Sequence, residues 1–183
     1  MPAMDFVELG PDPALMEDAA ALLTRTFKGM GKDAWPTIES AREELAECVA
    51  APNIAVGLLV EGRLGGWIGA RPMYERTWEL HPMLVDPALQ GAGYGRALIA
   101  ELERRAAELG VIGLVLGSDD ETEATSLSAV RLDESNYLKE LAAVKNRKHH
   151  PFEFYQKCGY MIVAAIPDAN GPGKPDIWMW KRL

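Results

Sequence analysis

Cysteine and histidine are scarce in this sequence. The 183 residues include two cysteines, Cys48 and Cys158, and three histidines. Neither cysteine has a neighbour at the short spacing that metal ligands require, and two cysteines are too few for a disulfide framework. We therefore expect no metal centre, and thiols that stay reduced in the cytoplasm.

Long hydrophobic runs are missing as well. No stretch of 18 consecutive apolar residues occurs, and residues 1–30 lack the basic start, apolar core and small-residue cleavage site of an export signal. The sequence thus predicts no membrane-spanning segment and no membrane partner. A cytoplasmic location fits best.

Positive charge is in short supply relative to negative charge. Lys and Arg number 19 against 27 Asp and Glu, which gives a formal net charge of −8. A nucleic-acid partner is disfavoured, because binding to phosphates requires a basic surface. The acidity favours cationic partners, although a net charge of this size also serves simply to keep a protein soluble.

The chain does contain enough apolar material for one domain over residues 1–183, since 48% of its residues are hydrophobic. Apolar alternation and continuous apolar runs predict strands at 6–9, 54–60, 64–71, 78–86, 111–116, 160–165 and 176–180. Helical spacing and end signals predict helices at 13–28, 38–49, 96–109 and 151–158, and 137–148 is compatible with a helix. The connection 29–36, which holds Trp35, suits either a loop over a substrate or simple filler.

A glycine cluster, Gln90-Gly91-Ala92-Gly93-Tyr94-Gly95, joins an expected strand to the strongest expected helix. Successive backbone N–H groups without bulky side chains, at the positive end of a helix dipole, are suited to binding a pyrophosphate. A Rossmann dinucleotide site is the rival interpretation. It is disfavoured because a hairpin and two helices precede this strand, and because no single ribose-binding carboxylate follows the next one.

The sequence resembles the GNAT acetyltransferase superfamily, whose acetyl-CoA signature Gln/Arg-x-x-Gly-x-Gly/Ala is matched by Gln90, Gly93 and Gly95. Within it, the chain is most similar to the aminoglycoside 6'-N-acetyltransferases. The segments that carry this closer resemblance are 78–82, 116–120, 150–155, 158–160, 169–171 and 174–179. The N-terminal third matches only in its order of elements.

The resemblance implies an α+β GNAT fold, with a mixed, mostly antiparallel sheet flanked by helices. It also implies that the sheet splits between the strand ending near Val85 and the strand starting near Val111, and that acetyl-CoA enters this split as cosubstrate. The residues expected to bind acetyl-CoA are Met83, Leu84, Val85, Gln90, Gly91, Ala92, Gly93, Tyr94, Gly95 and Arg96. Backbone N–H groups of the first three would face the pantetheine arm and the thioester carbonyl.

The reaction implied is acetyl transfer to the 6'-amine of an aminoglycoside antibiotic by direct attack in a ternary complex, which confers resistance. An ammonium with a pKa of roughly 10.4 must first lose a proton. Glu79 and His81, two apart and so on one face of a strand, are the candidate bases. Alternatively Glu79 only orients the ammonium, or His81 simply fits the strand and Glu79 is solvated. By resemblance Tyr155 donates a proton to the leaving thiolate; otherwise it is an ordinary interfacial tyrosine.

Acidic residues gather after the central apolar run, where a cleft for a polycationic substrate would need them. Asp119 and Asp120 leave a strand end, where open sheets place ligands, and Asp133 and Glu134 are weaker candidates. Tyr74 and Trp35 are suited to stacking on sugar rings or to the core.

Three hypotheses remain open from the sequence. The first is an aminoglycoside 6'-N-acetyltransferase; the second is a GNAT enzyme acting on a polyamine or a protein amine; the third is a module that binds acetyl-CoA without catalysis. Retention of Glu79, His81 and Tyr155 argues against the third. A homodimer is expected because dimers are common in the group that the chain resembles.

Overall fold

The computed structural model describes residues 3–29 and 34–183. Within them lie seven strands and five α-helices. The strands are β1 (Met4–Glu8), β2 (Ile54–Val60), β3 (Arg63–Pro72), β4 (Thr77–Val85), β5 (Gly113–Asp119), β6 (Met161–Ile166) and β7 (Asp176–Arg182). The helices are α1 (Pro13–Gly29), α2 (Ile38–Val49), α3 (Tyr94–Glu108), α4 (Tyr137–Ala142) and α5 (Phe152–Lys157), with short 3-10 turns η1 (Pro87–Leu89) and η2 (Leu127–Ala129).

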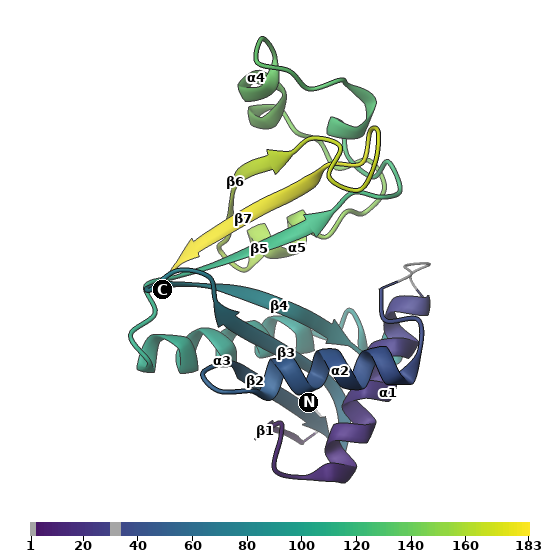
Figure 1. Ribbon diagram of the computed structural model, residues 1–183, viewed down its shortest axis with the longest axis vertical. Helices are drawn as coiled ribbons and strands as arrows, with labels where there is room; N and C mark the ends of the chain where they lie inside the picture. The colour runs from purple at the N-terminus through teal and green to yellow at the C-terminus, as the bar shows by residue number, and fades with distance from the viewer. Residues whose placement is uncertain (1–2, 30–33) are drawn as a thin grey trace. The chain divides into compact units, whose positions relative to one another are not determined.

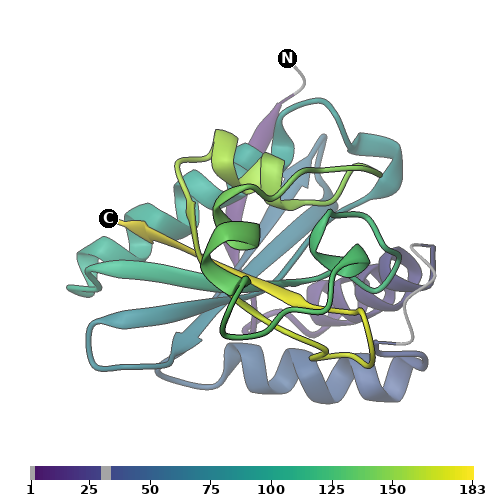
Figure 2. The same ribbon diagram turned by 90° about the horizontal axis from the view of Figure 1, so that it is seen from above.

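The chain divides into two compact units, residues 1–112 with Leu183, and residues 113–182. In the first unit β1, β2, β3 and β4 pair in that order, each antiparallel to the next. Helices α1 and α2 cover one face of this sheet, where they lie side by side (Figures 1 and 2). Helix α3 contacts β2, β3 and β4.

Trp67 of β3 anchors α1 to the sheet. Its side chain is fully buried, and its indole Nε1 donates a hydrogen bond of 3.1 Å to the carbonyl of Ala19. Leu22, Leu23 and Leu45 complete this core. Since truncating a buried aromatic side chain costs about 3–5 kcal/mol, Trp67 is a main source of stability for the helical layer.

Glycines let β3 and β4 approach closely. A Cβ at Gly66 would lie 2.7 Å from the carbonyl oxygen of Leu84, and one at Gly69 would lie 2.5 Å from that of His81. The register also shifts between Ile68 and Ala70. The glycines of β3 therefore accompany both a close approach of β4 and an irregularity in the strand pairing.

In the second unit β7 pairs antiparallel with β5 on one side and with β6 on the other (Figure 1). Gly113 leaves room for Trp180, whose Nε1 would lie 2.4 Å from a Cβ at that position. Tyr137 of α4 ties the helix to β6, because its hydroxyl oxygen accepts from the amide of Ala165 at 2.7 Å and lies 2.9 Å from the same residue's carbonyl.

The predicted α+β class, with strands flanked by helices, is confirmed, and the pairings within each unit are antiparallel. Boundaries differ by one or two residues at several strand ends, and β5 begins at Gly113 rather than at 111. The segment 137–148 is helical only to Ala142. The single domain over residues 1–183 and the split in the sheet stay predictions. Among the described residues, every helix is too short or too polar to cross a lipid bilayer.

Candidate functional site

Glu79 and His81 lie on β4, and each meets a partner from a different element. Nε of Arg71 on β3 donates to Oε2 of Glu79 at 2.7 Å. Nε2 of His81 lies 3.2 Å from Oε1 of Glu44 on α2. The Glu79 and His81 side chains are 22% and 28% exposed, so a solute can reach both.

Glu44 is held by two further donors. Trp35 donates through its indole Nε1 to Oε2 at 3.0 Å, and the thiol of Cys48 donates to Oε1 at 3.5 Å. The hydrogen bond with His81 lowers the pKa of Glu44 to about 2, against the opposing effect of burial. The carboxylate is therefore ionised throughout the physiological range.

The indole ring of Trp35 packs beside His81. Its ring centroid lies 5.8 Å from that of His81, and Phe27 meets it edge-on at 4.7 Å. Of the connection expected at 29–36, residues 30–33 lie outside the described residues, so its predicted role as a cover or as filler stays a prediction. Trp35 itself packs against the helical core and also contacts the histidine.

We call Trp35, Glu44, Cys48, Arg71, Glu79 and His81 the β4 cluster. Burial opposes ionisation of Arg71, but the hydrogen bond and charge of Glu79, with the charge of Glu44, raise its pKa. Burial and the charge of Glu44 raise the pKa of the Cys48 thiol, which stays protonated. The cluster thus holds two carboxylates, one guanidinium, a neutral thiol and an imidazole.

The glycine loop follows directly on β4. Gly91 and Gly93 have φ of +79° and +92°, and a Cβ at either would meet nothing within 4 Å. Gly93 is the N-cap of α3 and makes no side-chain cap hydrogen bond. Tyr94 is buried, whereas Gly91, Ala92 and Gly93 are exposed. Because the first N–H groups of a helix lack intrahelical acceptors, this exposed turn fits a pyrophosphate.

Gln90 ties the loop to the strand, since its side-chain Nε2 donates to the carbonyl of Val85 at 3.1 Å. Its predicted contact with acetyl-CoA stays a prediction. Leu84 and Val85 are buried and Met83 is half-buried, so their side chains belong to the packing of β4. Arg96 is exposed on the first turn of α3.

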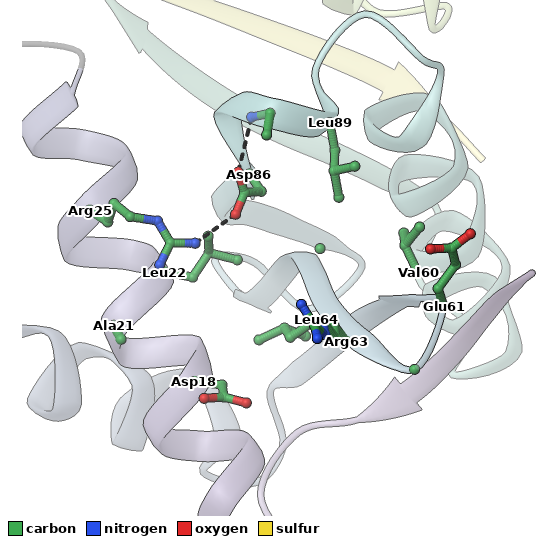
Figure 3. A pocket seen from close by; sticks show the side chains of 13 residues that line it. Asp18, Ala21, Leu22, Arg25, Val60, Glu61, Arg63, Leu64, Asp86 and Leu89 are labelled. Carbon is green, nitrogen blue, oxygen red and sulfur yellow. Dashed lines mark hydrogen bonds and ion pairs between the residues drawn. The ribbon is translucent and has the colours of Figure 1, made fainter. Parts of the chain in front are cut away.

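Asp86 fixes the turn that leads into this loop (Figure 3). Its carboxylate accepts from the amide of Ala88 at 2.9 Å and from Nη2 of Arg25 at 2.6 Å. The bond from Ala88 lowers the pKa of Asp86, with a further contribution from Arg25. These residues border a pocket of about 610 Å³ between α1, the β2–β3 turn and η1. Sequence reasoning assigned no role to Asp86 or Arg25.

Asp119 is the last residue of β5 in the second unit and Asp120 follows it, and their environments differ. Asp119 is half-buried and accepts a hydrogen bond from the side-chain amide of Asn170. Asp120 is 1% exposed and accepts from the amides of Ala124 and Thr125, at 2.6 and 2.8 Å. The hydroxyls of Thr125 and Ser128 also donate to it. All four of these donors come from its own turn.

Burial alone would raise the pKa of Asp120, but these hydrogen bonds outweigh it and hold the pKa below its ordinary value. The carboxylate thus organises the turn after β5 from the inside. Asp133 is exposed and caps the turn before α4, where its Oδ1 accepts from the amide and hydroxyl of Ser135. Glu134 borders the same segment.

Tyr155 lies on α5, among other aromatic rings. Its centroid is 5.2 Å from that of Phe154 and 5.9 Å from that of Tyr160, and burial raises its pKa. Tyr74 lies between β3 and β4 and is 67% exposed, while its amide donates to the carbonyl of Thr77. Its environment is that of a surface aromatic residue and not of the core.

A model of the acetyltransferase (GNAT) family matches residues 16–132. The chain belongs to the GNAT acetyltransferase family. Enzymes of this family use acetyl-CoA as cosubstrate, which is the cosubstrate that the sequence predicts.

Two solved structures are similar over 97% of this GNAT chain and 96% of their own. One is an aminoglycoside 6'-N-acetyltransferase complexed with coenzyme A, with 37% identity and a TM-score of 0.87. The other is the aminoglycoside 6'-N-acetyltransferase from Enterococcus faecium, with 36% identity and a TM-score of 0.89. The chain is also 39% identical over 79 residues to N-alpha-acetyltransferase RimI of Mycobacterium tuberculosis (strain ATCC 25618 / H37Rv). That match covers 40% of the chain and 46% of the curated relative.

Sequence reasoning missed Glu44 and Arg71. Glu44 lies on the expected helix 38–49, where an i, i+4 relation to Cys48 was the one local signal. Its contact with His81 joins positions 37 residues apart, which periodicity does not encode. For Arg71 the sequence indicated only that it ends the expected strand 64–71. Antiparallel pairing of this strand with 78–86 would have placed Arg71 opposite the first residues of the second strand.

Proposed function

We propose that this GNAT chain is an aminoglycoside 6'-N-acetyltransferase that confers resistance. The observation that carries the proposal is its identity of 36–37%, over nearly its whole length, to two solved proteins of that name. The β4 cluster supports it with chemistry, since a partly exposed imidazole paired with a carboxylate suits an acceptor that arrives as a cation.

The glycine loop would hold the pyrophosphate of acetyl-CoA through the backbone of Gly91, Ala92, Gly93 and Gly95. Open space at Gly91 and Gly93 lets the phosphates approach the N–H groups directly. Backbone groups of Met83 to Val85 are proposed to bind the pantetheine arm. Acetyl-CoA supplies the electrophilic thioester carbon there.

The acceptor amine must be neutral before it attacks. Glu79, whose carboxylate is already paired with Arg71, is proposed to orient the ammonium group. His81, whose partner is the carboxylate of Glu44, is proposed to take its proton directly or through a water. This division of roles follows from the partners that the two side chains already have.

Tyr155 is proposed to donate a hydrogen bond to the leaving sulfur. A thiol has a pKa of about 8.5 and a phenol one of about 10, and burial raises the pKa of Tyr155 further. Complete proton transfer from Tyr155 to the thiolate is therefore uphill. Stabilising the developing charge through a hydrogen bond is the role that fits this side chain.

Asp119 and Asp133 are proposed to bind other ammonium groups of the antibiotic, with Tyr74 stacking on a sugar ring. Asp119 is half-buried, and Asp133 and Tyr74 are exposed. Asp120 is not carried forward as a substrate contact, because its carboxylate is buried and engaged by its own turn.

A protein N-terminus is the second candidate acceptor. The similarity to N-alpha-acetyltransferase RimI over 79 residues favours it, although that match spans less than half of the relative. An N-terminal amine also arrives as a cation and must lose a proton. The experiment below also tests the two other hypotheses, namely a polyamine as the acceptor and a module that binds acetyl-CoA without catalysis.

The experiment measures release of CoA thiol with four acceptors, namely a kanamycin-type aminoglycoside, its 6'-hydroxyl analogue, spermidine and a peptide with a free N-terminus. We expect turnover with the first alone. Turnover with the 6'-hydroxyl analogue would contradict the 6' position, and faster turnover with the peptide would favour the second candidate. Absence of turnover with every amine would indicate a module that binds acetyl-CoA without catalysis. Raised resistance of bacteria expressing the chain, and a dimer by light scattering, are the further expectations.

A further inference from the structure

Glu44 of α2 lies outside every segment that carries the resemblance, yet it is the nearest carboxylate to the histidine. Its Oε1 lies 3.2 Å from Nε2 of His81, and its side chain is 15% exposed. It projects from a helix whose Ala41, Leu45 and Cys48 are buried in the core. The helix holds the carboxylate at a fixed place beside β4.

The orientation of this carboxylate is set on both oxygens. Trp35 donates to Oε2 at 3.0 Å, so the carboxylate oxygen that does not meet the histidine is also held. The Cys48 thiol donates to Oε1 from one turn further along α2. A capping box of Thr37 and Ser40 secures the first turn of this helix. Such fixed geometry is what one side chain needs in order to orient another.

We propose that Glu44 is a positioning residue that holds His81 with its Nε2–H toward α2 and thereby leaves Nδ1 as the site of proton uptake. The proposal rests on the proposed N-acetyltransferase function. An ionised carboxylate only accepts hydrogen bonds, so the hydrogen of the neutral ring must be on Nε2, and the lone pair is then on Nδ1.

The proton and electron balance of the step is complete. Nδ1 takes a proton from the acceptor ammonium, and the ring becomes an imidazolium whose charge faces Glu44. The freed amine lone pair forms the new C–N bond to the acetyl carbon, and the C–S electron pair leaves on sulfur. The attacking nitrogen, which then carries a positive charge, loses its second proton as the amide forms, and the sulfur takes up that proton as the CoA thiol. No oxidant, reductant or further reactant enters the step.

A purely structural role is the competing explanation, in which the contact only fastens α2 to β4. The two explanations differ in what happens when the charge is removed and the shape is kept. His81 contacts Glu44 at its ring Nε2, Cys48 at its backbone carbonyl and the ring of Trp35. Arg71 of β3 pairs with Glu79, and it also interacts with the charge of Glu44. Glu44 is therefore the charged group in direct contact with the ring nitrogen.

The first test is the pH profile of Glu44→Gln. Removing a carboxylate within hydrogen-bond distance of a base moves the acidic limb of kcat/KM to lower pH. The value at neutral pH falls by about 10- to 100-fold, the range seen for residues that orient metal-bound histidines. Glu43→Gln, at the exposed neighbouring position, makes the same change of charge on the same helix and serves as the control.

The second test does not depend on turnover. Nitrogen NMR of the labelled chain reports the tautomer of each of the three histidines, and His81→Gln assigns the signal. We expect His81 as the Nε2–H tautomer in the unmodified chain and a mixture in Glu44→Gln. This measurement stands even if no aminoglycoside is acetylated, so failure of the proposed function and failure of the positioning role are distinguishable.

Three results would overturn the proposal. They are an Nδ1–H tautomer in the unmodified chain, an unmoved tautomer in Glu44→Gln, and lost activity with an unmoved pH profile and a lowered melting temperature. A double variant, Glu44→Gln with His81→Gln, adds a fourth criterion. If Glu44 acts through His81, the double variant loses no more activity than His81→Gln alone, whereas additive losses contradict the proposal.

Discussion

Replacing Asp120 by alanine separates a structural carboxylate from a substrate contact. The substitution leaves two buried amides, of Ala124 and Thr125, without their acceptor. A buried donor without a partner costs about 1–3 kcal/mol, and the two hydroxyls that also donate to Asp120 can rotate to other acceptors. The free energy of unfolding should therefore fall by about 2–6 kcal/mol. In a chain of this size each kcal/mol lowers the melting temperature by about 2–4 °C.

The contribution of Asp120 to the free energy of unfolding should also depend on pH, in a direction that follows from its pKa. The folded pKa of Asp120 lies below its ordinary value, so its contribution to stability is complete above the unfolded pKa of about 3.9. That contribution is lost as the pH falls through the lower, folded pKa. The unmodified chain should lose this contribution to stability in acid. Asp120→Ala lacks the contribution at every pH, so its stability should depend less on pH.

The assay combines thermal unfolding between pH 3 and pH 7 with KM for the aminoglycoside at a temperature where both chains are folded. We expect a lowered melting temperature and an unchanged KM. Glu134→Ala, an exposed acid of the same unit, should change the melting temperature little and serves as the control. A raised KM with an unchanged melting temperature would refute the reasoning and return Asp120 to the substrate site.

Three further predictions concern the glycine loop, the turn that leads into it and the leaving group. Gly93→Ala forces a side chain into φ of +92°, which costs roughly 1–2 kcal/mol, and should weaken CoA binding by about five- to thirtyfold in calorimetry; unchanged affinity would argue against the phosphate role. Asp86→Ala removes the cap of η1, worth about 1 kcal/mol, and should lower the melting temperature more than Arg25→Ala does, because the ion pair with Arg25 is largely exposed. Tyr155→Phe should lower kcat by about tenfold or more and leave the KM for acetyl-CoA unchanged; an unaltered kcat would remove Tyr155 from the reaction.

Most of the fold could be predicted because local patterns encode it. The helix with Leu98 and Leu102 on one face, and the continuous apolar run ending at Leu116, each occur close to their predicted limits as α3 and β5. The glycine loop was found for the same reason, since a strand, a turn and a helix are adjacent in sequence. Prediction was least accurate at 137–148, which lacks a periodic apolar face and is helical for only six residues.

The candidate site was predicted less completely, because its partners come from distant parts of the chain. His81 was predicted as a candidate base, but the carboxylate beside it comes from a helix that resembles many other amphipathic helices. Asp120 was predicted at the substrate because it follows a central strand. The signal that it turns inward was the Thr125 and Ser128 downstream, since short hydroxyl side chains and an aspartate close together often form a local hydrogen-bonded turn.

The charges of the β4 cluster connect binding to the state of the histidine. With His81 neutral, Glu44 and Glu79 outweigh Arg71 by one negative charge, so a cationic acceptor is attracted. Protonation of His81 brings the cluster to zero and places a positive charge near the incoming ammonium. At an effective dielectric constant of 20, two like charges 4 Å apart repel by about 4 kcal/mol.

The same protonation event should therefore impair both binding and catalysis. An imidazolium repels the ammonium group and also has no lone pair with which to take its proton. We expect KM for the antibiotic to rise and kcat to fall together wherever His81 becomes protonated. In Glu44→Gln the cluster has no net charge while His81 is neutral, so KM should rise as kcat falls. If only kcat moved, the charge balance of the cluster would have no part in binding the acceptor, and other carboxylates such as Asp119 would have to supply the attraction.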